Sequence, residues 1–293
     1  MVLLTGANGF LGQVICRHNV FDRFFSLGRS NSDIICDLSK QVPLLPALDI
    51  VIHSAGKAHS VPKTDAENQE FFNVNVKGTE NLLKGLEQAP ALPKSFIFIS
   101  SVSVYGAELG LNIDENHPLN ASDPYGMSKI QAEEIVRTWC AENNVVCGIL
   151  RLPLIVGSNP PGNLGAMIRG VKSGYYFNIA GGKAKKSMVM AEDVARVISR
   201  LAEVGGTYNL TDGYNPSFNE LSIHIAKQLG KNKVLNMPKI FAVILAKIGD
   251  VWPKFPLNSN KLNKVTADLT FNDDKARSAL GWSPSSVLDA FKI

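Results

Sequence analysis

The sequence predicts an α/β fold, in which a doubly wound parallel sheet is followed by a smaller C-terminal lobe. Through the first half of the 293 residues, short β-branched or aromatic runs alternate with longer helical patterns, as in parallel sheets with crossover helices. After residue 151 this regularity is lost, and proline- and glycine-rich loops separate short helices. The composition, 45% hydrophobic and 19% charged, is that of an ordinary globular chain of one large or two small domains.

Each element of the sheet follows from a local pattern. Six apolar runs predict strands, at 2–4, 24–27, 34–36, 50–53, 96–100 and 145–150. The segments 65–88 and 124–143, which separate the last three runs, are long enough for crossover helices. The segment 187–209 has a strand, helix, strand pattern and is expected to rejoin the sheet, whereas short helices are predicted at 163–171 and 217–229. We therefore assign 1–152 and 187–209 to the sheet domain, and 153–186 and 210–293 to the lobe.

Charge and cysteine content exclude several classes of protein. With 30 Lys and Arg against 26 Asp and Glu, the net charge of +4 is too small and too dispersed to indicate a nucleic-acid binder. The cysteines form no Cys-x-x-Cys pair or zinc-binding spacing, so we expect no metal site and interpret them as reduced core thiols: Cys16, Cys36, Cys140 and Cys147.

Two segments bear on localisation. The chain runs from Met1 directly into a strand rather than a signal peptide, which predicts a cytoplasmic protein. The most apolar stretch, 240–248, is interrupted by Lys247 and is far shorter than the ~20 residues of a membrane span. It is expected to form a buried or interfacial helix.

The first strand ends in a glycine-rich sequence, TGANGFLG at 5–12, which leads directly into a helical segment. In this context Gly6 allows a tight turn, Gly9 lets the backbone approach a diphosphate, and Gly12 lets the helix pack closely on its strand. Free N–H groups at the start of the helix would face the anion. Turn geometry alone is the alternative interpretation, but the strand before and the helix after favour a dinucleotide site that also includes Phe10 and Leu11.

The end of the second strand bears on the choice between NAD and NADP. A carboxylate there would bind the ribose hydroxyl of NAD, but the sequence has Arg29 and Ser30, which favour a 2′-phosphate and hence NADP. Alternatively, Arg29 is a solvated cation that stacks on adenine. Asp37 and Leu38, which close the third strand, are expected at the adenine edge. The fourth strand ends in residues that leave room for ribose and nicotinamide, and the candidates there are Ala55, Gly56 and Lys57.

Ser101, Tyr125 and Lys129 form the candidate catalytic group. Tyr125 and Lys129 are one helical turn apart, so their side chains project from the same face, and Ser101 closes the strand just before that helix. Lowering the pKa of a phenol from ~10 to about 7 takes roughly 4 kcal/mol, which Lys129 and an oxidised nicotinamide can supply. Tyr125 would then exchange a proton with a substrate hydroxyl that Ser101 holds. A surface Tyr-Lys pair is the alternative.

At this point the chain resembles the extended short-chain dehydrogenases/reductases, in particular the nucleotide-sugar epimerases, dehydratases and reductases. Landmarks run in order over nearly the full length, among them HSAGKAH (53–59), NVNVKGTENLL (73–83), SSVSVYG (100–106), YGMSK (125–129), RLPLIVG (151–157), MAEDVA (190–195) and LGWSP (280–284). The resemblance implies a Rossmann domain that binds a dinucleotide, with Asn75 and Pro153 among its contacts, and a lobe that binds a nucleoside diphosphate sugar.

Departures from the family pattern narrow the reaction. Val102 and Ser103 stand where the family's 4,6-dehydratases carry an Asp-Glu pair, which argues against 4,6-dehydration. Lys186 replaces an arginine and can still meet a substrate diphosphate, as a point charge. Asn163 stands where relatives contact the sugar nucleotide, although a helix N-cap is an equally good interpretation.

Three classes of function follow from these patterns. The first is hydride transfer at C4 of a UDP-hexose or UDP-N-acetylhexosamine, as an epimerase or as an NADPH-dependent 4-ketoreductase, as in bacterial surface-polysaccharide enzymes. The second, a non-catalytic redox regulator, is disfavoured by the Tyr-Lys pair. The third is a membrane-associated scaffold using 240–252, although such an apolar stripe is more often core. By analogy with relatives, helices 65–88 and 124–143 would pair in a homodimer. The apolar positions Ile130, Ile135 and Val136 must pack somewhere, and packing on the sheet is the alternative for them.

Overall fold

The computed structural model describes residues 1–18, 21, 24–58, 62–252, 255 and 257–293. Its central sheet has seven strands in the order β11-β7-β5-β4-β1-β2-β3, and every neighbouring pair is parallel. The strands are β1 (Val2–Thr5), β2 (Phe24–Gly28), β3 (Ile34–Ile35), β4 (Ile50–His53), β5 (Ser95–Ser101), β7 (Val146–Leu152) and β11 (Gly206–Asn209). The strand order turns back between β1 and β4, so the doubly wound prediction is confirmed.

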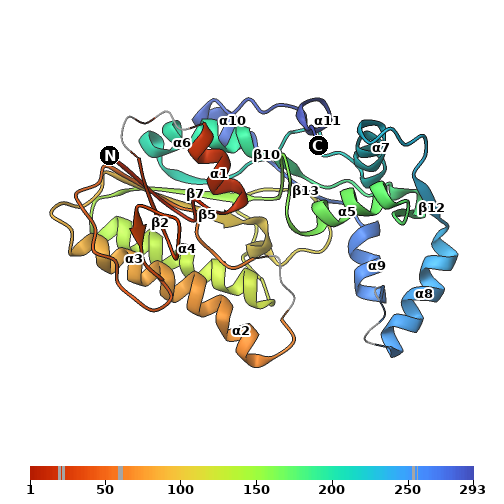
Figure 1. Ribbon diagram of the computed structural model, residues 1–293, viewed down its shortest axis with the longest axis horizontal. Helices are drawn as coiled ribbons and strands as arrows, with labels where there is room; N and C mark the ends of the chain where they lie inside the picture. Colours follow the sequence, from red (N-terminus) through yellow and green to blue (C-terminus); the bar gives the residue numbers. More distant parts are fainter. Residues whose placement is uncertain (19–20, 22–23, 59–61, 253–254, 256) are drawn as a thin grey trace.

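Helices cover both faces of this sheet (Figure 1). On one face lie α2 (Asp65–Phe72), a π-helical turn η1 (Asn73–Lys77), α3 (Gly78–Glu87) and α4 (Pro124–Glu142). On the other lie α1 (Phe10–Arg17), α6 (Ala191–Val204) and α10 (Asp274–Leu280). A separate hydrophobic cluster fills the space under each layer, because strands that are buried on both faces present apolar side chains to both.

The segment 187–209 rejoins the sheet only through its last strand. β10 (Met188–Met190) pairs with β8 (Leu154–Val156) in a separate ladder, while β11 pairs with β7 at the edge of the main sheet. A third hydrophobic cluster joins this ladder to α5 (Gly162–Ser173), α7 (Phe218–Gln228) and α11 (Val287–Ala290). The smaller elements are η2 (Val102–Tyr105), β6 (Gly110–Ile113), β9 (Phe177–Ile179), η3 (Ala180–Gly182), β12 (Leu235–Met237), α8 (Lys239–Val251), α9 (Ser259–Thr266) and β13 (Leu269–Phe271).

The apolar stretch at 240–248 does form a helix, α8, and of the two alternatives, a buried or an interfacial helix, the buried one is wrong for its large side chains. Its buried residues are the small ones, Ala242, Ala246 and Gly249, while Ile240 and Phe241 are 74% and 61% exposed. Close packing explains this, since a Cβ on Gly249 would lie 1.8 Å from the Leu257 carbonyl oxygen. No helix in the described ranges combines the length and the apolarity needed to cross a membrane.

The interpretation of the cysteines as core thiols holds for two of them. Among the described residues every cysteine is free, and Cys36 and Cys140 are buried. Cys16 is exposed, because it falls on the solvent face of α1, and Cys147 is half-buried. The described residues contain no cluster of side chains that would hold a metal ion.

The apolar positions of α4 that suggested a dimer interface have partners within the chain. Val136 is fully buried in the cluster beneath α3 and α4, and Ile135 packs at its margin. Ile130 packs on the small cluster around Tyr105. Sheet packing therefore accounts for Ile135 and Val136, the small cluster accounts for Ile130, and the homodimer stays a prediction that rests on the resemblance.

Candidate active site

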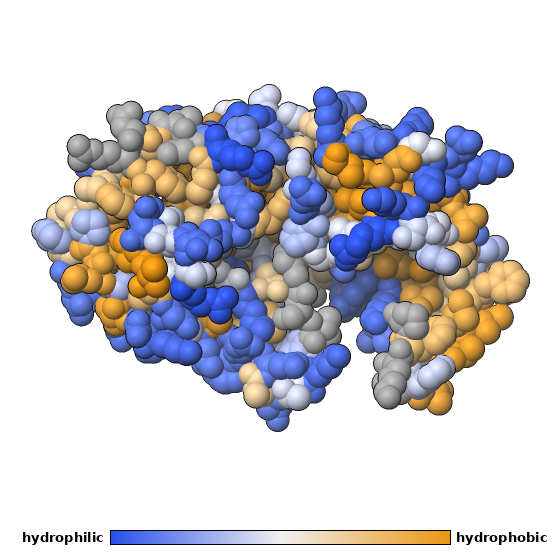
Figure 2. Space-filling view, viewed as in Figure 1, coloured by the Kyte–Doolittle hydropathy of each residue, from blue (hydrophilic) through white to orange (hydrophobic). Residues whose placement is uncertain are grey.

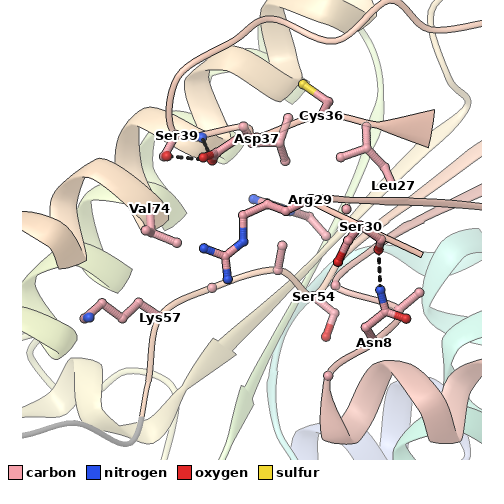
Figure 3. Close-up of a pocket in the computed structure, with 18 of the residues that line it drawn as sticks. Asn8, Leu27, Arg29, Ser30, Cys36, Asp37, Ser39, Ser54, Lys57 and Val74 are labelled. Carbon is pink, nitrogen blue, oxygen red and sulfur yellow. Dashed lines mark hydrogen bonds between the residues drawn. The ribbon is translucent and has the colours of Figure 1, made fainter. Parts of the chain in front are cut away.

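A cavity of about 490 Å³ opens at the carboxyl ends of β1, β2 and β4, where the strand order turns back (Figure 3). This is the place where open α/β sheets bind their ligands. Eight of the predicted cofactor residues line it, namely Gly6, Gly9, Arg29, Asp37, Leu38, Ala55, Gly56 and Lys57.

The glycine-rich turn forms the bottom of this cavity. Gly6 has a φ of +74°, and a Cβ there would lie 2.7 Å from the Ala55 nitrogen; a Cβ on Gly12 would lie 2.1 Å from the Gly6 carbonyl oxygen. The Gly9 N–H donates to that same oxygen at 2.9 Å. The turn thus fits only glycine at its two tightest positions, and α1 begins at its end.

The start of α1 is suited to an anion. Gly9 caps the helix, and its first turn carries no carboxylate, so the N–H groups there have no acidic competitor. Leu11 is buried in the core, and the Phe10 ring lies 3.2 Å from where a Cβ on Gly157 would stand. These two predicted residues therefore shape the turn from behind rather than lining the cavity.

Arg29 extends into the middle of the cavity, as Figure 3 shows. The loop that carries it is tied to the glycine turn, because Asn8 Nδ2 donates to the Ser30 carbonyl oxygen at 2.8 Å. Asp37 stands on the same wall, and Ser39 Oγ donates to Asp37 Oδ1 at 2.6 Å. This hydrogen bond is the main cause that lowers the pKa of Asp37, with smaller contributions from the cations Lys40 and Arg29. This part of the cavity therefore presents both a cation and a carboxylate.

Asn75 supports the part of the cavity wall that contains Lys57. Its Oδ1 accepts the Lys57 N–H at 2.7 Å, and its Nδ2 donates to the Lys57 carbonyl oxygen at 3.1 Å and to Ser128 Oγ at 2.9 Å. Asn75 lies in the π-helical turn η1 and is buried. It ties the loop after β4 to α4, a role that the sequence motif did not reveal. The Lys57 ammonium pairs with Glu70 of α2 at 2.5 Å.

The candidate catalytic side chains converge from two elements behind this loop. Ser101 is the last residue of β5 and the N-cap of η2. Its hydroxyl accepts a hydrogen bond from the Ser103 N–H at 3.1 Å. Tyr125 lies in the first turn of α4, which Asp123 caps by accepting the Gly126 N–H. The Ser101 hydroxyl donates to Ser103 Oγ at 3.1 Å, and its proximity to the Tyr125 hydroxyl lowers the pKa of Tyr125.

Lys129 lies one turn further along α4 and is buried directly beneath the cavity. Its Nζ is 3.3 Å from where a Cβ on Gly56 would stand, and it donates to the Ile99 carbonyl oxygen at 2.9 Å. The ammonium also lies 4.5 Å above the Phe98 ring. The absence of a side chain at Gly56 thus leaves the ammonium close to the cavity.

Burial dominates the titration of both catalytic groups. It lowers the pKa of Lys129 to about 8, although the Glu133 carboxylate one turn away acts in the opposite sense. Burial raises the pKa of Tyr125; the hydrogen bond to Ser101 lowers it, and the Asp123 carboxylate raises it. Because the Lys129 ammonium is directed to Ile99, the protein alone keeps the Tyr125 phenol protonated at neutral pH.

A buried polar network next to the site was not found from the sequence. Glu133 on α4 accepts Arg151 Nη2 at 2.8 Å and Ser100 Oγ at 2.5 Å, and Arg151 Nη1 donates to the Tyr105 hydroxyl at 3.1 Å. The glutamate and arginine lie 18 residues apart, so no short motif contains the pair. The network fixes the ends of β5 and β7 against α4.

His53 is a second buried group whose role is structural. Its two ring nitrogens lie 2.7 Å from Thr5 Oγ1 and 2.9 Å from Thr79 Oγ1. Burial, together with the nearby Lys129 cation, lowers the pKa of His53 to about 3, so the ring is neutral. It joins β1 and β4 to α3.

The candidate substrate residues are dispersed over the lobe. Lys186 is half-buried beside β13, where burial lowers the pKa of its ammonium and Asp268 raises it. Asn163 is exposed and is the second residue of α5, whose N-cap is Pro161, so the N-cap interpretation is wrong. Pro153 separates β7 from β8. None of these three belongs to the described residues that line the cavity.

Residues 2–211 match the NAD dependent epimerase/dehydratase family. The chain belongs to this family. Its cofactor is accordingly a nicotinamide dinucleotide, and the glycine turn, the anion-facing start of α1 and the cavity beside them fit such a group.

Similar proteins in this family are known 4-epimerases. N-acetyl-alpha-D-glucosaminyl-diphospho-ditrans,octacis-undecaprenol 4-epimerase of Escherichia coli O157:H7 is 29% identical over 303 residues, covering 95% of this chain and 89% of the relative. UDP-glucose 4-epimerase of Vibrio cholerae is 25% identical, covering 99% and 93%. The solved structure of UDP-N-acetylglucosamine 4-epimerase from Bacillus cereus shares the fold, with a TM-score of 0.73, 21% identity, and coverage of 97% and 94%.

Proposed function

We propose that this protein inverts C4 of a hexose or N-acetylhexosamine carried on a diphosphate, with Tyr125 as the acid and base. The observation that carries the proposal is that Ser101 lies near Tyr125, and that Lys129, one turn further along α4, lies 3.3 Å from where a Cβ on Gly56 would stand. Gly56 lines a cavity suited to a dinucleotide. Similar proteins that are named for 4-epimerisation support the choice of carbon.

In this proposal Ser101, Tyr125 and Lys129 have different roles around the C4 hydroxyl of the sugar. The Ser101 and Tyr125 hydroxyls lie near each other, so a substrate hydroxyl that enters between them would meet both a donor and a proton acceptor. When bound, the oxidised nicotinamide supplies a hydride acceptor and a positive charge. That charge and the Lys129 ammonium would ionise the Tyr125 phenol, and the phenolate would take the C4 hydroxyl proton as C4 gives up its hydride to the dinucleotide. Tyr125 would return the proton when the hydride comes back to the other face of the keto sugar. Lys129 is placed to hold the ribose side of the cavity and to supply a second cation.

The proposal leaves two alternatives for the group that carries the sugar. Relatives are named for a UDP-sugar and for a sugar on an undecaprenyl diphosphate, and both carriers present the same diphosphate to the protein. We place that diphosphate near Lys186, with Asn163 as a second contact from α5. A role in surface-polysaccharide synthesis is consistent with either carrier.

The test is turnover by the purified protein with NAD. UDP-N-acetylglucosamine, UDP-glucose and N-acetylglucosaminyl diphospho-undecaprenol are offered separately, and the C4 epimer is measured by NMR or chromatography. Tyr125→Phe is expected to lower turnover by about 10²- to 10⁴-fold while dinucleotide affinity stays within twofold. Tyr175→Phe, on an 81% exposed tyrosine, is the matched control and should be silent. Turnover by Tyr125→Phe within tenfold of wild type would refute the assignment.

Arg29 supports a second candidate, a 4-ketoreductase that consumes NADPH. Its guanidinium stands in the cavity and can pair with a 2′-phosphate, which contributes ~1.5–3 kcal/mol, or roughly ten- to a hundredfold in affinity. Arg29→Asp should therefore reverse the preference of the enzyme from NADPH to NADH in a binding titration. Lys40→Asp is the matched control, since Lys40 also lies near Asp37, at 3.6 Å, but does not line the cavity. Equal affinities with no response to Arg29→Asp would return the assignment to NAD and an epimerase.

A further inference from the structure

Helix α8 is packed with its small residues inward and its large apolar residues outward. Six large apolar side chains form one stripe along the outer face of the helix, with exposed fractions of 45 to 86%: Ile240, Phe241, Ile244, Ile248, Val251 and Trp252. Figure 2 shows this stripe as a hydrophobic patch at the edge of the lobe. Contiguous exposed apolar surface of this kind marks a binding surface.

The inward face explains why the stripe cannot simply turn into the core. Ala242 and Ala246 pack with Leu262 of α9 in a small cluster, and Gly249 lies against the Leu257 backbone. Rotating α8 would drive large side chains into a gap that only alanine and glycine fit. The stripe is therefore a stable feature of the folded lobe.

The charge around α8 identifies the partner. The segment 231–264 contains seven lysines and a single acidic residue, Asp250, so it carries a net +6, although the whole chain carries only +4. The rest of the chain is therefore net negative by two charges. Lys231, Lys233, Lys239 and Lys247 are exposed. Asp250 does not offset them outward, because it accepts from the Ser259 N–H and hydroxyl.

We propose that α8 docks this protein on a bilayer that contains anionic lipids. An apolar stripe with aromatic side chains, bordered by lysines, is the pattern of a helix that lies in the membrane interface. The apolar side chains would enter the headgroup boundary while the lysines meet lipid phosphates, each contributing roughly fivefold to partitioning. A second copy of the chain fits less well, because two such faces would bring the exposed lysines of one copy against those of the other.

The surface is also hollowed on the side of α9 that lies away from the stripe in the view of Figures 1 and 2. Figure 2 shows the surface hollowed between the end of the sheet domain near α2 and the α8–α9 part of the lobe. The docking itself does not depend on the proposed reaction and is tested without it.

The experiment is vesicle flotation of the full chain. Wild type should float with vesicles of phosphatidylglycerol and phosphatidylcholine and not with phosphatidylcholine alone. The double variant Ile244→Glu/Ile248→Glu should lower the bound fraction at least tenfold, because it places two carboxylates in the stripe. Lys239→Gln and Lys247→Gln should each weaken partitioning roughly fivefold. Leu44→Glu, on an 87% exposed leucine of the sheet domain, and Lys292→Gln are the matched controls and should bind as wild type.

Each contrary outcome has one meaning. Absence of wild-type flotation, or binding that survives the Ile244/Ile248 double variant, overturns the proposal. An oligomer that this variant splits into monomers, without any vesicle binding, would show instead that the stripe is a self-association surface. Melting temperatures must match wild type, which is expected because the substituted side chains are exposed. Turnover on a UDP-sugar is measured in parallel, so a failed reaction and a failed docking are separate results.

Discussion

The buried ion pair between Glu133 and Arg151 gives a sharp test of how the site is held. Glu133 is fully buried, and its carboxylate accepts hydrogen bonds from Arg151 Nε at 3.1 Å and from Arg151 Nη2 at 2.8 Å. Glu133→Gln keeps the shape of the side chain but removes its charge, which leaves the guanidinium buried without a counter-charge. Breaking a buried pair from one side costs about 3–5 kcal/mol, so the free energy of unfolding should fall by that amount.

Guanidinium unfolding followed by circular dichroism measures this loss directly. At about 2–4 °C per kcal/mol for a chain of this size, the melting temperature should fall by roughly 6–20 °C. Glu134→Gln is the control, because Glu134 is the next residue, is 74% exposed, and pairs with Arg137 at 3.5 Å. An exposed pair contributes about 0–1 kcal/mol. A loss for Glu133→Gln no larger than that of the control would refute the reasoning.

The same substitution should also move the pH dependence of activity. Glu133 raises the pKa of Lys129, which burial has lowered to about 8, so its removal should lower that pKa further. Lys129 then loses its proton at a lower pH. Activity that requires the ammonium should therefore decline at a lower pH on the alkaline side of the profile. An alkaline limb that does not move would show that the ammonium is not required.

The other predictions concern His53 and Gly12. The pKa of His53 is held at about 3, so below its unfolded pKa of ~6.5 only the unfolded chain takes up the proton, and about 3 kcal/mol of stability should be lost between pH 6.5 and pH 4. In guanidinium titrations at pH 6.5 and pH 4, the His53→Gln variant should not show this pH-dependent loss of stability. The control His18→Gln, on an exposed histidine, should still show it. Gly12→Ala should weaken dinucleotide binding, because its Cβ would lie 2.1 Å from the Gly6 oxygen, and overpacking of this kind costs roughly 1–3 kcal/mol. Gly78→Ala, whose nearest contact would be an ordinary 3.6 Å, is the control in the same titration.

The sheet was predictable because its strands are nearly continuous apolar runs. Val2–Thr5 and Ser95–Ser101 are buried along their whole length, so the sequence of each strand carries its own signal. Turn residues such as Gly6 mark where strands end, and this placed eight of the residues that line the cavity. Boundaries differed by one or two residues, as expected where helix and strand ends fray.

What the sequence could not predict depends on contacts between distant segments. Asp37 and Arg29 share a wall of the cavity only because β2 and β3 are neighbours in the sheet. Asn75 carries a family motif, but its support of the cavity wall depends on Ser128, 53 residues away. In α8 the helical period was evident, but nearly every position is apolar, so the pattern could not decide which face is buried. The small residues and the close approach of Leu257 decide it.

The position of α8 relative to the family match has a functional consequence. Residues 2–211 contain the glycine turn, Ser101, Tyr125 and Lys129, whereas α8 and all seven lysines of 231–264 lie beyond the match. The groups proposed for the chemistry at C4 and the groups proposed for membrane docking thus occupy different parts of the chain. Variants of the α8 stripe should then leave turnover of a water-soluble UDP-sugar unchanged and lower it only for a sugar whose carrier is embedded in vesicles. Equal losses on both substrates would mean that α8 supports the fold of the lobe instead of its placement at a bilayer.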